Sequence, residues 1–427
     1  MTTVMPGHRT AWTSRSFRRL WTASTVSTFG SEIAELALPL LALVTLSATA
    51  GEVALLRVAQ FVPFLVATLP VGLLVDRHVR LRLRLMIGAD VGRFALFAVI
   101  PLAVWAGAAQ VELLYGVVFA AGILTVVYQV ADFALLPSVV PADQLVDANG
   151  KLAASQSANE IGGRGLGGLL VELVSAPAAV AVNAASFLTS AVSLRGVTLD
   201  EPSTASPEEQ PDLAVGDRRT RQELTEGLRV ALGHRYIRAL LGEATTYNAF
   251  NEVFMLGLLL HAVRDLHLSA AVIGLVFTAG GVGSFVGAWF GSRVTGRFGY
   301  GRVLLVTLLL GNTAPLALAF FSRATLPLLC LVFAVVGVGI GVANVHAVSL
   351  RQVTLPDRLR GRVNAAYRLI SWGAIPLGAT LGGVAAAELG ARPAMLLGAA
   401  GVATSTLWVA FSGVPRLRTI EEAAVTG

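Results

Sequence analysis

The sequence has little charge and almost no cysteine. Of its 427 residues only 14% are charged and 55% are hydrophobic, whereas about 25% are charged in a typical soluble protein. This composition excludes an ordinary soluble domain, because one aqueous core cannot bury so much apolar sequence, and we expect the chain to lie in a membrane. The single cysteine, Cys330, excludes an internal disulfide and a cysteine-ligated metal cluster.

The motifs of nucleotide- and metal-dependent proteins are also missing. Gly150 and Lys151 are followed by Leu152 and lack the upstream glycine of a Walker loop, so ATP is not expected to drive the protein. The six histidines are scattered and form no H-E-x-x-H motif, so we expect no metal. Without a nucleophile–base pair we expect neither an enzyme nor a cofactor. The glycine-rich run at 337–341 predicts close helix packing or bending.

Long apolar runs fill most of the chain. A membrane-spanning helix needs about 20 mostly apolar residues, whereas the strands of a membrane barrel would show segments of about ten alternating residues. Twelve runs of helical length lie at roughly 20–47, 53–75, 84–106, 111–137, 144–172, 177–195, 237–262, 270–293, 302–322, 326–350, 358–388 and 392–413. They predict an all-α membrane protein with twelve transmembrane helices in two six-helix bundles.

The distribution of arginine predicts the orientation. If the N-terminus is cytoplasmic, nearly all arginines fall in inner loops, and the outer loops receive only Arg264, Arg323 and Arg392, with Arg57 at the outer end of a run. We therefore expect a multi-pass protein of the plasma (bacterial inner) membrane with both termini cytoplasmic and no cleavable signal peptide. Because the arginines are dispersed over many loops, no nucleic-acid partner is expected.

A polar segment divides the two sets of six runs. Its first part is rich in Pro, Ser and Glu and predicts a linker, and its second part places Leu224, Leu228 and Leu232 on one face of an amphipathic helix expected on the inner membrane surface. The predicted division is a bundle at 1–195, a linker with this helix at 196–235, and a second bundle at 236–427.

The two predicted bundles resemble each other at an offset of 215 residues. This offset aligns Pro141 with Pro356, Asn149 with Asn364, Gly72 with Gly287, and Gly163, Gly167 and Gly168 with Gly378, Gly382 and Gly383. Chance recurrence of small residues is the weaker explanation, because Pro and Asn follow the same offset as the glycines. Six-helix halves in parallel repeat are typical of secondary transporters with a substrate site near the membrane midplane.

One inner loop carries a recognisable motif. The stretch GLLVDRHVR places Gly72, Asp76, Arg77 and Arg80 in the pattern G-x-x-x-D-R-x-x-R. With LLPSVVPADQLVDANG, SLRQVTLPDRLRGRVNAAYRLISWGAIPLG and the Asp90–Arg93 pair, the chain resembles the major facilitator superfamily, within it the drug- and siderophore-exporter group of macrolide-efflux and enterobactin exporters. Two positions depart from the family pattern. Gly291 replaces the acid in the second copy, and Arg164 replaces proline in GRGLGG.

The resemblance implies a proton-coupled antiporter that exports a small amphipathic organic compound, such as an antibiotic, a macrolide-like drug or a siderophore, by alternating access. Such efflux would confer multidrug resistance. The resemblance also implies a conformational latch: Asp76 would meet the helix that begins near Pro356, Gly72 would allow close backbone contact, and Arg77 and Arg80 would pair with acids or phosphates. A purely topological role for these arginines stays open, as do import of a metabolite and lipid movement as alternative functions.

Acids inside apolar runs are the candidates for proton coupling, because a charge in the membrane is costly and marks function. The first candidate for the proton-carrying residue is Glu35, followed by Asp132 and Glu32. For Glu35, a packing role beside an arginine is an equally weighted alternative. Glu160 and Arg164 are spaced i, i+4 and can pair. Glu243 is expected near the inner end of its run and outside the buried interior.

A mostly apolar cavity with a few polar groups is expected for the substrate. Its candidate residues are Tyr128, Gln129, Glu160, Arg164, Asn248, Asn251, His346 and Trp372. Packing or lipid-facing roles remain open for the aromatic ones, and His346 is expected as a hydrogen-bonded interior histidine. The expected partners are the substrate, protons and the lipid bilayer, and the protein is expected to be a monomer.

Overall fold

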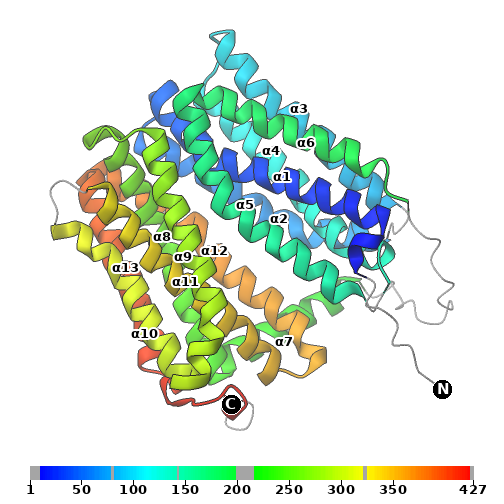
Figure 1. Ribbon diagram of the computed structural model, residues 1–427, viewed down its shortest axis with the longest axis vertical. Coiled ribbons are helices and arrows are strands. Elements are labelled where there is room, and N and C mark those ends of the chain that lie inside the picture. Colours follow the sequence, from blue (N-terminus) through cyan, green and yellow to red (C-terminus); the bar gives the residue numbers. More distant parts are fainter. Residues whose placement is uncertain (1–9, 78–80, 142–143, 199–215, 321–324, 424–427) are drawn as a thin grey trace. The chain divides into compact units, whose positions relative to one another are not determined.

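The computed structural model describes residues 10–77, 81–141, 144–198, 216–320 and 325–423, and every regular element in these ranges is helical (Figure 1). The chain forms two compact units. The first comprises Met1–Leu41 and Val62–Glu209, and the second comprises Ala42–Phe61 and Gln210–Gly427. Residues 42–61, which the sequence division placed in the first bundle, thus group with the second unit.

Thirteen long helices follow one another in the described residues. They are α1 (Arg15–Leu40), α2 (Ala50–Arg77), α3 (Arg82–Trp105), α4 (Val111–Leu135), α5 (Leu145–Leu173), α6 (Ala176–Leu194), α7 (Gly216–Gly233), α8 (Arg235–Leu260), α9 (Ala270–Phe298), α10 (Tyr300–Thr313), α11 (Leu326–Thr354), α12 (Asp357–Leu389) and α13 (Ala391–Ala410). Short 3-10 or π turns extend α1, α4, α8 and α10. Helix α7 coincides with the predicted amphipathic segment.

Ten of the described helices are long and apolar enough to cross a membrane. Helices α5 and α8, with 29 and 26 residues, are also long enough at about 1.5 Å per residue, but they carry more polar side chains. All twelve lie at the predicted apolar runs. The predicted all-helical membrane fold is therefore confirmed. The two more polar helices, α5 and α8, carry several of the candidate site residues.

The internal repeat is visible in the helices themselves. Helices α1 and α8 each have 26 residues and run into a five-residue π turn, at Leu41–Thr45 and His261–Asp265. A residue with positive φ follows each turn, Ser47 at 53° and His267 at 50°. These elements lie 220 residues apart, as do the starts of α2 and α9, whereas the starts of α6 and α13 lie 215 apart.

The changing offset corrects part of the sequence alignment. With the helix starts as the guide, Asp76 corresponds to Gly296 and not to Gly291. Gly72 likewise corresponds to Ser292 instead of Gly287. A single offset failed because the connections in the two halves differ in length. With either alignment, the second half of the chain has a glycine at the position where the first half has Asp76.

Glycines bring the same helices together in each unit. A Cβ at Gly167 of α5 would lie 3.1 Å from the Ile33 carbonyl oxygen of α1, and a Cβ at Gly382 of α12 would lie 3.0 Å from the Val253 Cα of α8. Small residues allow such backbone approach in membrane helices. These two glycines are partners at the predicted offset of 215, so the repeat extends to the packing of α5 on α1 and of α12 on α8.

The glycine-rich run at 337–341 packs α11 closely against α9. A Cβ at Gly337 would overlap the Gly280 carbonyl oxygen, and one at Gly341 would overlap the Ser284 carbonyl oxygen. The expected role of this run in close packing is thereby confirmed. In Figure 1, α9 and α11 run beside each other within the second unit.

Candidate functional site

A buried ion pair within α3 is the centre of a polar cluster in the first unit. Asp90 and Arg93 lie one helical turn apart, are 0% and 3% exposed, and form an ion pair. The Arg93 guanidinium lies 4.3 Å from the ring centroid of Phe187 on α6 and 4.5 Å from that of Tyr128 on α4. Two aromatic faces therefore hold the arginine by cation–π contact and fix its position in the apolar interior.

A second carboxyl group completes this cluster. Asp132 lies one turn after Tyr128 on α4, near enough to Asp90 for the two charges to interact. Its Oδ1 is buried without a hydrogen-bond partner among the described residues, as is Oδ2 of Asp90. Ser190 of α6 lies beside Asp90 and Tyr128. Two carboxyl groups thus accompany one guanidinium, and binding of one proton would leave the cluster without net charge.

The candidates on α1 and α5 form a second, more open cluster in the same unit. Arg164 donates from Nε to Glu32 Oε2 at 2.9 Å, whereas its spacing also allowed a pair with Glu160. Glu35 and Glu160 lie close enough to interact with the arginine charge, and Glu160 accepts a 3.4 Å hydrogen bond from Gln156. The side chains of Arg164 and Glu32 are 39% and 17% exposed, so this cluster is less enclosed than the Asp90–Arg93–Asp132 cluster.

The second unit buries a carboxyl group among neutral partners. Glu243 of α8 is only 7% exposed, which corrects the expectation that it lies outside the interior. Asn312 of α10 lies 3.4 Å from Glu243 Oε1 and donates to Ser405 at 3.0 Å and Thr406 at 3.1 Å, both on α13. Among the described residues, the hydrogen bond of the Glu243 carboxyl group is with a neutral side chain. Sequence reasoning missed Asn312, because nothing in its apolar run marks it as a partner of Glu243.

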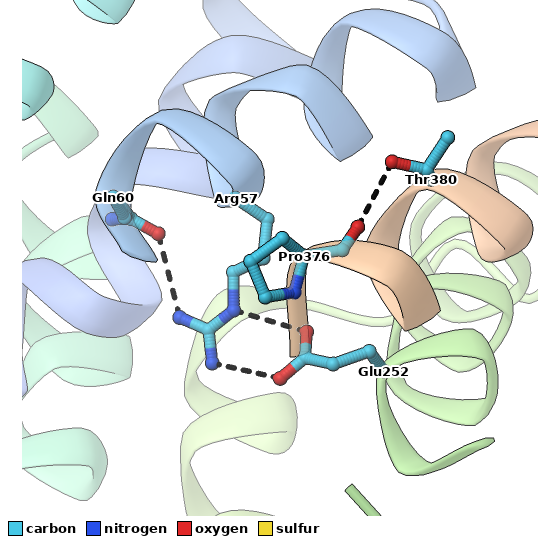
Figure 2. A network of polar contacts seen from close by, with 5 residues as sticks. All are labelled: Arg57, Gln60, Glu252, Pro376 and Thr380. Atoms are coloured by element: carbon cyan, nitrogen blue, oxygen red, sulfur yellow. Dashed lines mark hydrogen bonds and ion pairs between the residues drawn. The ribbon is translucent and has the colours of Figure 1, made fainter. Parts of the chain in front are cut away.

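An ion pair between α2 and α8 also belongs to the second unit (Figure 2). Arg57 donates from Nε and Nη2 to the two carboxylate oxygens of Glu252 at 3.0 and 3.2 Å, and from Nη1 to Gln60 at 3.4 Å. Its guanidinium lies 4.6 Å from the Phe61 ring centroid. Figure 2 shows Pro376 of α12 beside the pair. The sequence placed Arg57 at the outer end of an apolar run; it lies in α2 and binds Glu252, a pairing that the sequence did not predict.

The other cavity candidates do not join these clusters. Gln129 is exposed. Asn248 donates to the Ser371 carbonyl at 2.7 Å, and half-buried Asn251 lies one turn from it on α8. Trp372 lies under Arg368, whose guanidinium is 4.2 Å from its ring. His346 is buried, with Nε2 3.0 Å from Thr295 Oγ1 and Nδ1 2.9 Å from the Val342 carbonyl oxygen, as expected for an interior histidine.

The structure describes the latch motif only in part. Gly72 lies inside α2, and a Cβ added there would meet no heavy atom within 4 Å. Asp76 and Arg77 are the last residues of α2, and their side chains lie outside what the structure describes. Arg80 lies outside the described residues. The latch therefore stays a prediction.

Comparison with known proteins identifies the relatives of this arrangement. The family described as "Transmembrane secretion effector" matches residues 10–426. The niacin transporter NiaP of Acinetobacter baylyi is 30% identical over 137 residues, which is 32% of this chain and only 31% of that protein.

Solved structures share the fold at low sequence identity. A bacterial homologue of the lysosomal transporter Spinster superposes with a TM-score of 0.68 at 14% identity, covering 96% of this chain and 98% of that chain. The nucleoside transporter NupG gives 0.68 at 11% identity, covering 92% and 98%. A bacterial homologue of the iron transporter ferroportin gives 0.62 at 18% identity, covering 93% and 98%. At these identities the likeness shows the fold alone.

Proposed function

Because the chain belongs to the family described as transmembrane secretion effector, which is of the major facilitator type, we propose that this membrane transporter exports a small amphipathic organic compound in exchange for protons. The cargo class is an antibiotic, a macrolide-like drug or a siderophore, and the mode of transport is alternating access. The description of the family as a secretion effector supports the outward direction.

The excess of acid in the Asp90–Arg93–Asp132 cluster is the observation that carries this proposal. Arg93 is held between two rings and paired with Asp90, so Asp132 is the carboxyl group without a cation of its own. With Asp132 protonated, the cluster has no net charge. With Asp132 ionised, one negative charge is uncompensated among apolar helices, which is unfavourable in a membrane protein. That cost favours a conformation in which water reaches the group.

The same reasoning orders the other acids. Glu32 is paired with Arg164, and Glu35 lies near the same arginine in a more exposed cluster. Loss or gain of a proton there is compensated by the cation and by water, so it biases the conformation less. Asp132 therefore moves ahead of Glu35 as the proton carrier, and Glu32 and Glu35 become candidates for contact with the cargo.

Import of a metabolite is the second candidate. The 137-residue match to a niacin transporter favours it, and the nucleoside transporter with the same fold is consistent with it. The same cluster would then couple proton entry to uptake of the substrate. Export and import predict opposite directions of proton-driven movement, so one assay distinguishes them.

Asp132→Asn tests the proposed function. In inside-out membrane vesicles with an acidic interior, we expect wild-type protein to accumulate radiolabelled erythromycin, and the variant to lose at least 90% of this accumulation at equal abundance. Glu112→Gln, an exposed acid on the same helix, is the matched control and should transport as the wild type does. Full accumulation by Asp132→Asn would remove this residue from the coupling mechanism, and uptake driven only by the opposite gradient would favour import.

A further inference from the structure

Each unit contains a basic pocket, one beside the start of α1 and the other beside the start of α8. In the first unit, the start of α1 and the end of α6 border an open pocket of about 370 Å³. Its lining consists of Arg15, Arg18, Arg19, Thr22, Val192, Ser193 and Gly196. Three guanidinium groups thus line one hollow.

The second unit has a similar pocket between the start of α8 and the end of α13. Its volume is about 490 Å³, and its lining consists of Arg235, Arg238, Ala239, Thr246, Thr404, Leu407, Trp408, Phe411 and Ser412. No Asp or Glu lines either pocket in the part of the chain that the structure describes. Among the described residues, the charged side chains on the walls of both pockets are therefore all arginines.

The two pockets occupy equivalent positions in the repeat. The 220-residue offset of the first helices aligns Arg15 with Arg235 and Arg18 with Arg238. All four arginines are exposed, and in both helices the two residues between them are buried. The same helix pairs, α1 with α6 and α8 with α13, form the pocket walls. Two halves with different sequences have thus kept one basic site in the same place, which a random scatter of topological arginines would not produce.

The lining suits a phosphate group attached to a hydrocarbon chain. Guanidinium binds phosphate through parallel N–H donors. Next to the arginines stand exposed apolar side chains that can lie along an acyl chain: Val192 is 59% exposed, Trp408 50% and Phe411 87%. Tryptophan with a hydrogen-bonded N–H is typical of the headgroup level of a membrane, and Trp408 donates to Thr246 at 3.0 Å.

We propose that these two pockets bind the headgroups of anionic phospholipids, one lipid at each repeat. Basic pockets between membrane helices on the cytoplasmic side bind such headgroups. The assignment to the cytoplasmic leaflet rests on the predicted orientation of the chain. The pockets themselves depend neither on the cargo nor on the proton coupling of the proposed function.

Native mass spectrometry of the purified full chain with phosphatidylglycerol tests the proposal. We expect the wild type to retain two lipids, Arg15→Gln/Arg18→Gln one, Arg235→Gln/Arg238→Gln one, and the quadruple variant none. Each arginine near the membrane surface contributes roughly fivefold to affinity, so each double variant should bind about 25-fold more weakly at its pocket. Arg84→Gln/Arg302→Gln removes the same number of exposed arginines from other helices and should keep both lipids.

Three further experiments use the wild type alone and identify the chemical nature of the ligand. For the wild type alone, lipid retention should fall with rising salt, because exposed charge interactions are screened, and phosphatidylcholine should not be retained. Inorganic phosphate at equal concentration should not displace phosphatidylglycerol. Two retained lipids in the quadruple variant, equal retention of phosphatidylcholine, or displacement by free phosphate would overturn the proposal. Because the readout is lipid binding, failure to transport erythromycin has no bearing on it.

Discussion

At the scale of single residues, the cluster of Asp90, Arg93 and Asp132 holds two acids in different surroundings: Asp90 is buried, whereas Asp132 is half-buried. Asp90 compensates the Arg93 charge directly, whereas the Oδ1 of Asp132 has no hydrogen-bond partner in the described residues. Removing one partner of a buried ion pair leaves an uncompensated charge and costs about 3–5 kcal/mol, but removing a surplus buried charge relieves an electrostatic penalty. The two acids should therefore respond oppositely to the same chemical change.

We predict that Asp90→Asn lowers the free energy of unfolding by about 3 kcal/mol, whereas Asp132→Asn leaves it unchanged or raises it. The thermal midpoints of the two purified variants, measured at one pH and in one detergent, check this. Glu112→Gln is the neutral reference for each. Equal destabilisation by both substitutions would contradict the separate roles of the two acids.

The sequence predicted which charged residues lie inside the helices better than it predicted which residues they bind. Glu32, Glu35 and Asp132 were visible because each interrupts an apolar run, and the Asp90–Arg93 spacing already allowed an ion pair within one helix. The pairing of Arg164 with Glu32, and that of Arg57 with Glu252, joins residues 132 and 195 positions apart. Such choices depend on which helices pack together, and no local pattern encodes them.

At the scale of helices, backbone contact between α9 and α11 determines what the glycine positions tolerate. The carbonyl oxygens of Gly280 and Ser284 occupy the space that a Cβ at Gly337 or Gly341 would need. Backbone atoms cannot move away by a rotamer change, so a larger residue must push the helices apart. Overpacking in a well-packed interior costs about 1–3 kcal/mol or more.

We predict that Gly341→Leu reduces the yield of folded protein and lowers the free energy of unfolding by about 3 kcal/mol or more. Gly116→Leu on α4 is the control, because a Cβ at Gly116 would meet no heavy atom within 4 Å. Monodispersity in size-exclusion chromatography and the thermal midpoint measure the effect. A Gly341→Leu variant as stable as the control would show that α9 and α11 do not pack this closely.

The cap of α8 makes the stability of this helix depend on pH. His234 Nδ1 accepts a 3.5 Å hydrogen bond from the backbone N–H of Ile237 at the start of α8. Burial, and after it the neighbouring Arg235 charge, lowers the pKa of His234 below its ordinary value of 6.5. The folded protein thus favours the neutral ring. Its stabilising effect is fully present above pH 6.5 and is lost as the pH falls below that value.

We predict that the thermal unfolding midpoint of the wild type decreases when the pH is lowered from about 7.5 to about 5.5. The substitution His234→Asn should remove this part of the pH dependence. Asparagine is a good helix N-cap without a titrating group, so its own cost should stay below about 1 kcal/mol. His267→Asn, at an exposed residue with positive φ, is the matched control. An unchanged pH dependence in His234→Asn would contradict the role of the cap.

Helix positions were largely predictable because apolar runs of this length have few other structures open to them in a membrane. The alignment of the two halves was not predictable in full, because one offset cannot describe two halves whose connections differ in length. The polar character of α5 and α8 comes in part from charged side chains: Glu160 and Arg164 lie on α5, and Glu243 and Glu252 lie on α8.

At the scale of the whole molecule, composition and hydrophobic runs predicted the membrane fold, and the family match confirms a transporter of the major facilitator type. The grouping of residues 42–61 with the second unit was not predictable. It depends on contacts such as Arg57 with Glu252 and Arg264 with the Ala48 carbonyl, which link distant parts of the chain. Cargo and direction follow from neither composition nor fold, because one fold supports transport of unrelated compounds.

The central claim is that movement of the cargo requires a proton to bind and leave Asp132. Its most direct measurement is proton movement in proteoliposomes that contain a pH-sensitive dye, started by an imposed gradient of erythromycin. We predict that the wild type moves protons against the direction of the drug, and that Asp132→Asn moves none while Glu112→Gln behaves as the wild type. Drug transport without any counter-movement of protons in the wild type, or unchanged proton movement in Asp132→Asn, would contradict the account.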